Sequence, residues 1–171
     1  MRKVILFIAS SLDGYIARQS GDIDWLFTDQ DYGYSEFFAS VDTLLMGRKT
    51  YEQVLTFGEY PYKGVKSYVF TKNPLFPADS NAEVIREDIT EFVEKLRQVD
   101  GKNIWLVGGS QLTHALMSQN LVDELILSIH PTILGEGIPL FDNGTISQSL
   151  NLTKCQTYDS GLVQLSYDVG H

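Results

Sequence analysis

Two glycine-containing segments of the sequence have the composition of a phosphate-binding site. Residues 44–52 and residues 104–112 each run from an apolar stretch through glycine into a helix-like pattern. Such a junction directs unpaired backbone N–H groups and the positive end of the helix dipole at one point, where a phosphate group can bind. In the first segment, Gly47 permits close approach to the backbone, and Arg48 and Lys49 add positive charge. Two such junctions in one small chain fit a dinucleotide.

Each of these features also has an ordinary structural explanation. A lone Gly-Gly pair after a strand is most often a turn, and Arg48 and Lys49 by themselves are more often a solvated surface pair. A third polar segment favours the functional interpretation, because Thr71, Lys72 and Asn73 directly follow an apolar run. Their hydroxyl and ammonium groups could bind a further phosphate.

The elements that must position these residues alternate between strand-like and helix-like patterns. Short apolar runs typical of strands buried on both faces occur at 4–9, 43–46, 67–71 and 104–107. Helix-like patterns occur at 34–39, from residue 49 or 50 onward, at 88–98 and at 110–119. This alternation predicts an α/β fold with a largely parallel sheet and helices on both faces.

The C-terminal part of the chain has a different pattern. Strand-like runs at 124–132, 150–157 and 163–169 are separated by irregular segments, and 158–161 is typical of a hairpin loop. These runs predict an antiparallel edge on the α/β sheet. The glycine-rich segment 134–139 lacks the following helix and the third glycine of a nucleotide-binding finger, so we interpret it as a loop.

Composition and charge limit the classes of function. The chain has 171 residues, of which 43% are hydrophobic and 20% charged, as expected for one globular domain spanning residues 1–171. The net charge of −9 argues against binding of DNA, RNA or an anionic membrane. A single cysteine, Cys155, and three scattered histidines predict neither a disulfide nor a metal site, in a reducing cytoplasm. The apolar N-terminal run is too short for a signal peptide, and no later run reaches the roughly 20 residues of a membrane span.

Four segments of the chain resemble the dihydrofolate-reductase-like superfamily in composition and order. They are IASSLDGYIA at 8–17, MGRKTYE at 46–52, VGGS at 107–110, and VDEL at 122–125 with HPTILGEGIPLF at 130–141. The segments at 122–125 and 130–141 are similar to the reductase domain of the bacterial bifunctional riboflavin-biosynthesis deaminase/reductase and to its small stand-alone relatives. The resemblance covers nearly the whole chain. It implies a three-layer α/β/α fold with a mixed, mainly parallel sheet of eight or nine strands, and NADPH lying across the strand ends.

The resemblance also assigns cofactor-binding roles to individual residues. The pyrophosphate region would be held by Gly47, Arg48, Lys49 and Thr50, with Arg48 also near the 2′-phosphate. The 2′-phosphate and adenosine side would be completed by Thr71, Lys72 and Asn73. The nicotinamide and the pyrophosphate would lie over Val107, Gly108, Gly109, Ser110, Gln111 and Leu112. The nicotinamide would be flanked by Ala9, Ile16 and Ala17.

Hydride transfer to a C=N or C=O bond leaves negative charge on the heteroatom, so a proton source assists the reaction. By resemblance to dihydrofolate reductases, Asp31 would supply this proton and Trp25 would lie beside the substrate. A surface acidic loop explains Asp31 about as well, because Asp22, Asp24 and Asp29 lie in the same stretch.

Three further residues are candidate substrate contacts, namely Ser11, Asp13 and Ser128. A serine in a strand is more often structural. The chain departs from both groups of relatives, because residues 110–113 lack the tyrosine that dihydrofolate reductases place near the nicotinamide. It also lacks an arginine pair positioned for a folate tail, and the zinc-binding deaminase half is absent. A ribose phosphate would need a basic pocket, for which the candidates are Arg18, Lys63 and Lys66.

These observations favour an NADPH-dependent reductase of a small heterocyclic or imine-type substrate, similar to 5-amino-6-(5-phosphoribosylamino)uracil reductase. The alternatives are a dihydrofolate or pteridine reductase, and a module that binds NADP without catalysis. The expected partner is a small molecule rather than nucleic acid or membrane. A homodimer is a further expectation, because the aromatic-rich residues 51–68, with Phe57, Tyr60 and Tyr62, could form an apolar patch.

Overall fold

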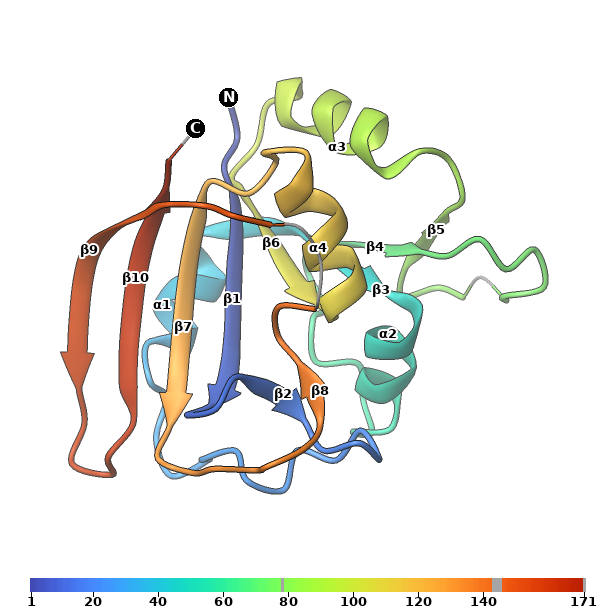
Figure 1. Cartoon of the computed structure of the whole chain (residues 1–171). Coiled ribbons are helices and arrows are strands. Elements are labelled where there is room, and N and C mark those ends of the chain that lie inside the picture. The colour runs from blue at the N-terminus through green and yellow to red at the C-terminus, as the bar shows by residue number, and fades with distance from the viewer. Residues whose placement is uncertain (78, 143–145, 171) are drawn as a thin grey trace.

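The carboxyl ends of six parallel strands meet at one edge of the central sheet. In the computed structural model, which describes residues 1–77, 79–142 and 146–170, eight strands form this sheet (Figure 1). Their spatial order is β5 (Glu83–Ile85), β4 (Lys66–Phe70), β3 (Val41–Gly47), β6 (Asn103–Gly108), β1 (Val4–Ser11), β7 (Glu124–His130), β10 (Val163–Val169) and β9 (Leu150–Thr157). The first six are parallel, whereas β10 and β9 each run antiparallel to their neighbour. The predicted parallel sheet with an antiparallel C-terminal edge is confirmed.

Helices cover both faces of this sheet. The helices in the described residues are α1 (Tyr34–Ala39), α2 (Arg48–Leu55), α3 (Ile89–Gln98) and α4 (Ser110–Ser118). Because successive side chains of a strand point to opposite faces, Leu45 of β3 packs with α3 and α4, whereas Leu44 packs with α1 and Met46 with α2. The three layers expected from the resemblance are therefore present. Among the described residues, none of the helices has the length and apolar character needed to cross a membrane.

A second, smaller sheet lies beside the main one. It pairs β2 (Tyr15–Ala17) with β8 (Ile138–Pro139) in antiparallel orientation. We predicted a loop at 134–139, and two of its residues form this strand instead. Gly137, just before β8, has a φ of +153°, and a Cβ there would collide with the carbonyl oxygen of Ala17. The glycine thus allows the two backbones to approach.

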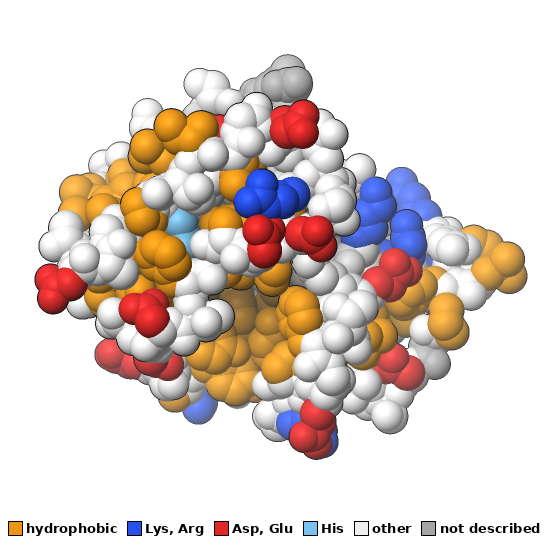
Figure 2. Space-filling view, turned by 90° about the horizontal axis from the view of Figure 1, so that it is seen from below, with side chains coloured by type: hydrophobic (Ala, Val, Ile, Leu, Met, Phe, Trp, Pro, Cys, Tyr) orange, Lys and Arg blue, Asp and Glu red, His pale blue; other side chains and the backbone are white. Residues whose placement is uncertain are grey.

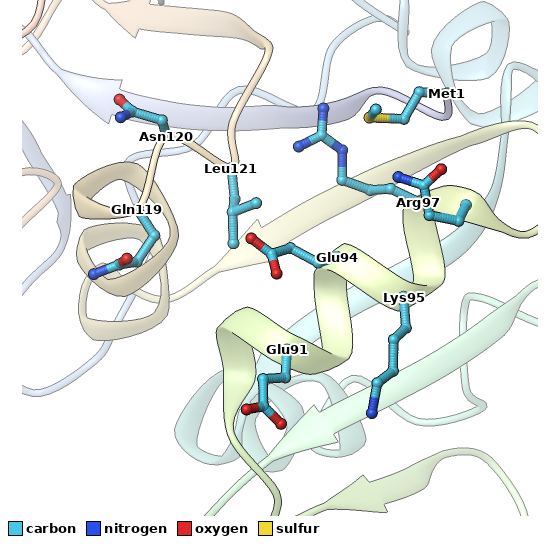
Figure 3. A pocket seen from close by; sticks show the side chains of 9 residues that line it. Met1, Glu91, Glu94, Lys95, Arg97, Gln119, Asn120 and Leu121 are labelled. Atoms are coloured by element: carbon cyan, nitrogen blue, oxygen red, sulfur yellow. The ribbon is translucent and has the colours of Figure 1, made fainter.

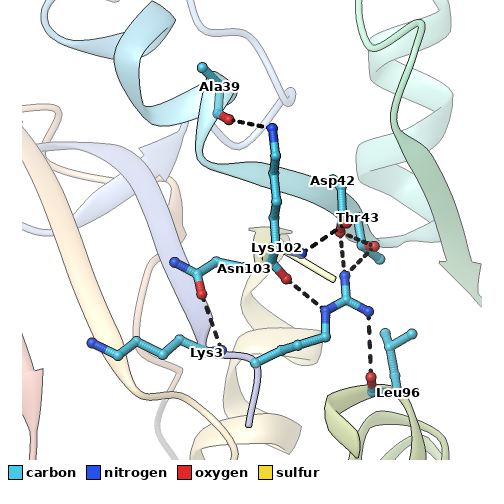
Figure 4. Close-up of polar contacts among 8 residues, drawn as sticks. Lys3, Ala39, Asp42, Thr43, Leu96, Lys102 and Asn103 are labelled. Carbon is cyan, nitrogen blue, oxygen red and sulfur yellow. Dashed lines mark hydrogen bonds and ion pairs between the residues drawn. The ribbon is translucent and has the colours of Figure 1, made fainter. Parts of the chain in front are cut away.

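A buried arginine fixes the amino edge of the main sheet (Figure 4). Arg2 is 8% exposed and donates from Nε to Lys102 O at 2.6 Å and from Nη2 to Thr43 Oγ1 at 2.7 Å. Its guanidinium also contacts the Asp42 carboxylate and donates to Leu96 O at 3.4 Å. A buried charge is tolerated only when its hydrogen-bonding groups are paired. The network therefore ties β1 to β3, to α3 and to the turn before β6.

Both ends of the chain lie at this amino edge (Figure 1). Asp123 N donates to Val4 O at 2.8 Å, and Val169 N donates to Asp123 O at 2.9 Å. The first strand thus starts where the last strand ends. The carboxyl edge of the parallel strands is the opposite edge.

Most of the aromatic side chains that we expected at a dimer contact pack inside this chain. Tyr60 is 7% exposed and donates to Ser67 Oγ at 2.6 Å. The ring of Tyr62 packs edge-on against Trp105, with centroids 5.3 Å apart. Phe57 is 55% exposed and is the part of this stretch that a second copy could still contact.

Candidate functional site at the carboxyl edge of the sheet

The carboxyl edge of the sheet brings together the segments predicted to bind a dinucleotide. β3 ends at Gly47, β6 ends at Gly108, and β4 ends at Phe70, directly before the segment 71–73. Because β3 pairs with both β4 and β6, the three segments start side by side. Figure 2 views this edge and shows a hollow walled largely by hydrophobic side chains, with several Lys and Arg side chains gathered to one side.

The two glycine junctions form one cradle. Gly47 is the N-cap of α2 and Gly109 is the N-cap of α4, and neither helix start has a side-chain cap. A Cβ on Gly47 would lie 3.6 Å from Gly109 N, and a Cβ on Gly109 would lie 3.3 Å from Thr50 Oγ1. The Gly108–Gly109 peptide bond is cis. The first turns of the two helices therefore begin next to each other at residues without a Cβ, where their N–H groups could bind a phosphate.

Cations surround the α2 side of this cradle. Arg48 forms an exposed ion pair with Glu52 at 2.8 Å, and Lys49 is exposed. After β4, Asn73 N donates to Thr71 Oγ1 at 3.1 Å, which shapes a turn that leaves Lys72 exposed.

Arg86 is a candidate that sequence reasoning missed. It directly follows β5 and donates to Asn73 O at 3.3 Å and to Phe76 O at 2.9 Å. Its position after an apolar run was a usable signal, because Arg48 and Lys72 also follow strands.

The cofactor-binding candidates differ in accessibility. Ala17 and Leu112 are buried, at 6% and 5% exposed, and Leu112 packs in the core beneath α4. Half-buried positions are held by Ala9, Ile16, Val107, Gly109 and Ser110. Gln111 is exposed on the first turn of α4. A cofactor bound over this edge would thus contact the half-buried residues directly. Leu112 would instead hold α4 in place through its packing in the core.

Trp25 and Ser128 lie in the buried part of the predicted substrate side. Trp25 is 9% exposed, and its Nε1 is buried without a hydrogen-bond partner among the described residues. Its ring stands edge-on to His130, with centroids 5.2 Å apart. Ser128 Oγ accepts a hydrogen bond from Gln164 Nε2 at 3.1 Å. An unpaired buried indole N–H is costly, so a ligand acceptor at this position would be stabilising.

Asp13 and Ser11 have local partners. Ser11 Oγ donates to Asp13 Oδ1 at 2.6 Å, and the same carboxylate accepts from Leu134 N at 3.1 Å and Gly135 N at 2.9 Å. The hydrogen bond from Ser11 is the main reason that the pKa of Asp13 lies below its ordinary value. Asp13 therefore holds the loop before β8 against the end of β1.

Asp31 lies three residues before the first residue of α1, whose N-cap is Gly33, and its carboxylate binds the first turn of that helix. Its carboxylate accepts from Ser35 Oγ at 2.6 Å and from Ser35 N at 3.1 Å. The side chain is exposed, and these hydrogen bonds lower the pKa of Asp31 below its ordinary value of 3.8. The surroundings thus favour the charged form, whereas a proton donor must be neutral before it acts.

The cations proposed for a ribose phosphate are in different places. Lys66 begins β4 and pairs with Glu83, so it lies toward the amino edge, away from the strand ends. Lys63 pairs with Glu59 on the surface. Arg18, directly after β2, remains at the carboxyl edge.

Comparison with known proteins identifies the family. The model of the RibD C-terminal domain family matches residues 2–164. The chain belongs to the RibD C-terminal domain family. Two curated relatives, both called uncharacterized proteins of Bacillus subtilis (strain 168), are similar over most of their length. YwjB is 41% identical over 170 residues, covering 97% of each chain, and YyaP is 39% identical over 180 residues, covering 97% of this chain and 94% of YyaP.

Solved structures support the RibD C-terminal domain fold of the chain. A proposed riboflavin biosynthesis protein of Shewanella sp. PV-4 has a TM-score of 0.87 and 28% identity, with 99% of each chain covered. The Thermotoga maritima diaminohydroxyphosphoribosylaminopyrimidine deaminase/5-amino-6-(5-phosphoribosylamino)uracil reductase has a TM-score of 0.77 at 17% identity. The match covers 99% of this chain and 57% of the Thermotoga maritima chain. The resemblance stated from the sequence is confirmed.

A recess at the amino edge of this RibD C-terminal domain is separate from the strand ends. It has a volume of about 550 Å³ and lies between α3 and α4, where Figure 3 shows Glu94 reaching toward Leu121. Arg97 on its wall is held by Asp123 at 3.1 Å. None of the buried side-chain atoms that lack a partner in the described residues belongs to its lining. The strand-end cradle, unlike this recess, is formed by residues that the resemblance assigns to the cofactor.

Proposed function

We propose that this RibD C-terminal domain protein is an NADPH-dependent reductase that transfers a hydride to a small heterocyclic or imine-type substrate. The observation that carries the proposal is the cradle of Gly47 and Gly109, where two uncapped helix starts face one space. Bound NADPH would supply the hydride. The chain would supply the binding site, the orientation of the substrate and the control of protons.

The residues present fit a dinucleotide with an extra phosphate. The backbone N–H groups of α2 and α4 would hold the pyrophosphate, since a Cβ at either glycine would narrow the space. Arg48, Lys72 and Arg86 follow three adjacent strands and would hold the 2′-phosphate. The exposed Arg48–Glu52 pair contributes little by itself, so Arg48 is free to turn to a phosphate. These cations favour NADPH over NADH.

The substrate would lie on the Trp25 side of the cofactor. The Trp25 indole N–H would donate to a carbonyl or ring nitrogen of the heterocycle, which satisfies a buried donor. Specific recognition of such a group is strong when a buried partner would otherwise be unpaired. A pyrimidine of the riboflavin pathway offers acceptors of this kind.

Titration with NADPH and NADH, followed by turnover assays, tests this function. Tryptophan fluorescence of the purified chain should show tighter binding of NADPH than of NADH. NADPH oxidation would then be measured with the phosphoribosylated pyrimidine, its dephosphorylated form and dihydrofolate. Binding of neither dinucleotide, or a clear preference for NADH, would contradict the proposal. Binding without turnover would favour the non-catalytic module, and turnover of dihydrofolate alone would favour a folate-type enzyme.

Asp31→Asn should lower kcat at neutral pH by less than about tenfold. General acid catalysis contributes about 100-fold or more, but it requires a neutral acid. Because Ser35 lowers the pKa of Asp31, its neutral form is present only in acid and disappears as pH rises through that lowered pKa. Steady-state rates with saturating NADPH measure this. A loss of about 100-fold or more, without change in NADPH affinity, would instead show that Asp31 is the proton donor.

Arg18→Gln should selectively weaken binding of a phosphorylated substrate. Arg18 donates from Nε to Asp24 at 2.6 Å and from Nη2 at 3.2 Å, and a phosphate would compete with this exposed carboxylate. Losing a charged hydrogen bond should raise KM for the phosphoribosylated pyrimidine by about tenfold. KM for the dephosphorylated form should stay within about twofold.

Lys66→Gln is the matched control, because Lys66 lies toward the other edge of the sheet. It should change neither KM value. Equal effects of Arg18→Gln on both substrates would show that Arg18 does not bind the phosphate.

A further inference from the structure

His130 is a buried histidine that the proposed reaction does not use. It ends β7, is 3% exposed, and has a partner at each ring nitrogen. Nε2 lies 3.2 Å from Phe27 N, and Nδ1 lies 3.1 Å from Ser128 O. The Phe27 N–H can only donate, so Nε2 accepts, and Nδ1 carries the proton and donates to Ser128 O. The arrangement therefore requires the neutral imidazole.

The imidazole also packs between two aromatic rings. Trp25 stands edge-on to it with centroids 5.2 Å apart, and the ring of Phe27 lies 5.0 Å away. His130 pairs with Ser11 across the β1–β7 ladder, so its position is set by the centre of the sheet. The ring thus joins a rigid strand end to a segment 103 residues away in sequence.

That segment, residues 18–33, has few other supports. It forms turns but no helix or strand between β2 and α1. Near its ends, Gln53 Nε2 donates to Gly21 O at 2.7 Å, and Gln164 Nε2 donates to Tyr32 O at 3.0 Å. His130 holds the middle, next to Trp25. Tyr32 also bonds Ser160 Oγ at 2.9 Å and packs edge-on against Tyr158 near the same end. The bond from Phe27 N to His130 Nε2 is therefore the contact that ties the middle of the segment, beside Trp25, to the end of β7.

We propose that neutral His130 is a positioning residue, which holds segment 18–33 against the end of β7 and thereby fixes Trp25 in the substrate site. The kinetic consequence rests on the proposed function, whereas the structural consequence does not. A group that fixes a substrate contact before binding lowers the ordering cost of binding, so its loss should raise KM rather than lower kcat.

Proton uptake by His130 should release the segment. A second N–H on the ring would leave Nε2 unable to accept from Phe27 N. Burial lowers the pKa of His130 below its ordinary value of 6.5, so its contribution to stability is present above that value and is lost as pH falls through the lowered pKa.

Several charged groups lie on the elements packed against His130. The charged groups on segment 18–33 are Arg18, Asp22, Asp24, Asp29 and Asp31, the loop after β1 contributes Asp13, and β10 contributes the neutral Gln164. Hydrogen bonds from Ser11, Arg18 and Tyr32 lower the pKa of Asp13, Asp24 and Asp29, respectively. These hydrogen bonds thus favour the ionised form of the three carboxylates.

Two substitutions separate positioning from general support of the fold. His130→Phe keeps an aromatic ring between Trp25 and Phe27 but removes the acceptor, whereas His130→Gln places an amide oxygen near the Nε2 position. We expect His130→Phe to raise KM for the substrate by about tenfold or more, with kcat and NADPH affinity within about twofold of wild type. His130→Gln should restore KM to within about threefold and remove the acid dependence of KM. Equal KM values for the two variants, or an equal loss of NADPH affinity, would overturn the proposal.

Tryptophan fluorescence of the full chain without any ligand gives an independent readout. An acid titration should show a transition in wild type and in Trp105→Phe, and none in His130→Gln or Trp25→Phe. This arm needs no turnover, so it still decides the proposal if the proposed reductase function fails. It also decides the proposal if His130→Phe does not fold. A transition that persists in His130→Gln, or none in wild type, would overturn the role of His130.

Discussion

Gly109→Ala is expected to raise the Kd for NADPH by about tenfold or more, which corresponds to about 1.4 kcal/mol. Gly109 has φ −90° and ψ −154°, a conformation that alanine also adopts, so the backbone itself is not strained. The added Cβ would lie 3.3 Å from Thr50 Oγ1, between the starts of α2 and α4. It would occupy the space through which a phosphate reaches both sets of N–H groups. Isothermal titration calorimetry with NADPH measures the effect.

Gly47→Ala tests the opposite wall of the same cradle. Its Cβ would lie 3.6 Å from Gly109 N, an ordinary contact, so the variant should fold normally and still bind NADPH less tightly. Thermal unfolding without ligand serves as the control for both variants. Unchanged NADPH affinity in both would show that the cofactor does not enter between the two helices.

Gly137→Ala should destabilise the folded chain by about 2–4 kcal/mol. Its φ of +153° is a conformation that alanine rarely adopts, and the new Cβ would collide with Ala17 O. The pairing of β2 with β8 would have to open to relieve the collision. Thermal unfolding should therefore show a fall in Tm of roughly 5–15 °C for a chain of this length.

Gly135→Ala is the matched control in the same loop. Gly135 has a φ of +78°, but a Cβ there would meet nothing within 4 Å. In this variant the free energy of unfolding should fall only by the backbone cost of a left-handed alanine, about 1–2 kcal/mol. Equal falls in Tm for the two variants would show that the contact with Ala17 O is not the cause.

The sequence predicted that the two glycine junctions join strands to helices because these signals are local. A glycine between an apolar run and a helical pattern occupies consecutive positions, as in 44–52 and 104–112. Parallel strands then place such junctions at one edge without further information. The contact of Gly47 with Gly109 could not be read from the chain, because it depends on the pairing of β3 with β6.

The substrate side was harder to predict because its contacts are distant in sequence. The Asp13 carboxylate accepts hydrogen bonds from the backbone of Leu134 and Gly135, which are 121 and 122 residues away. Nothing in the sequence near His130 indicates that Phe27 N, 103 residues away, reaches its ring. The resemblance predicts a proton-donor role for Asp31, whereas its bonds to Ser35, four residues on, favour the charged carboxylate and depend on where α1 begins.

The location of both chain ends at the amino edge has a practical consequence. The start of β1 and the end of β10 meet through Asp123, on the side of the sheet away from Gly47 and Gly109. An affinity tag, a fluorophore or a surface linkage attached at either end would leave the opposite edge facing solution (Figure 1). Immobilised protein should thus bind dinucleotide as freely as protein in solution, so that surface-based binding assays can be used on the chain without redesign.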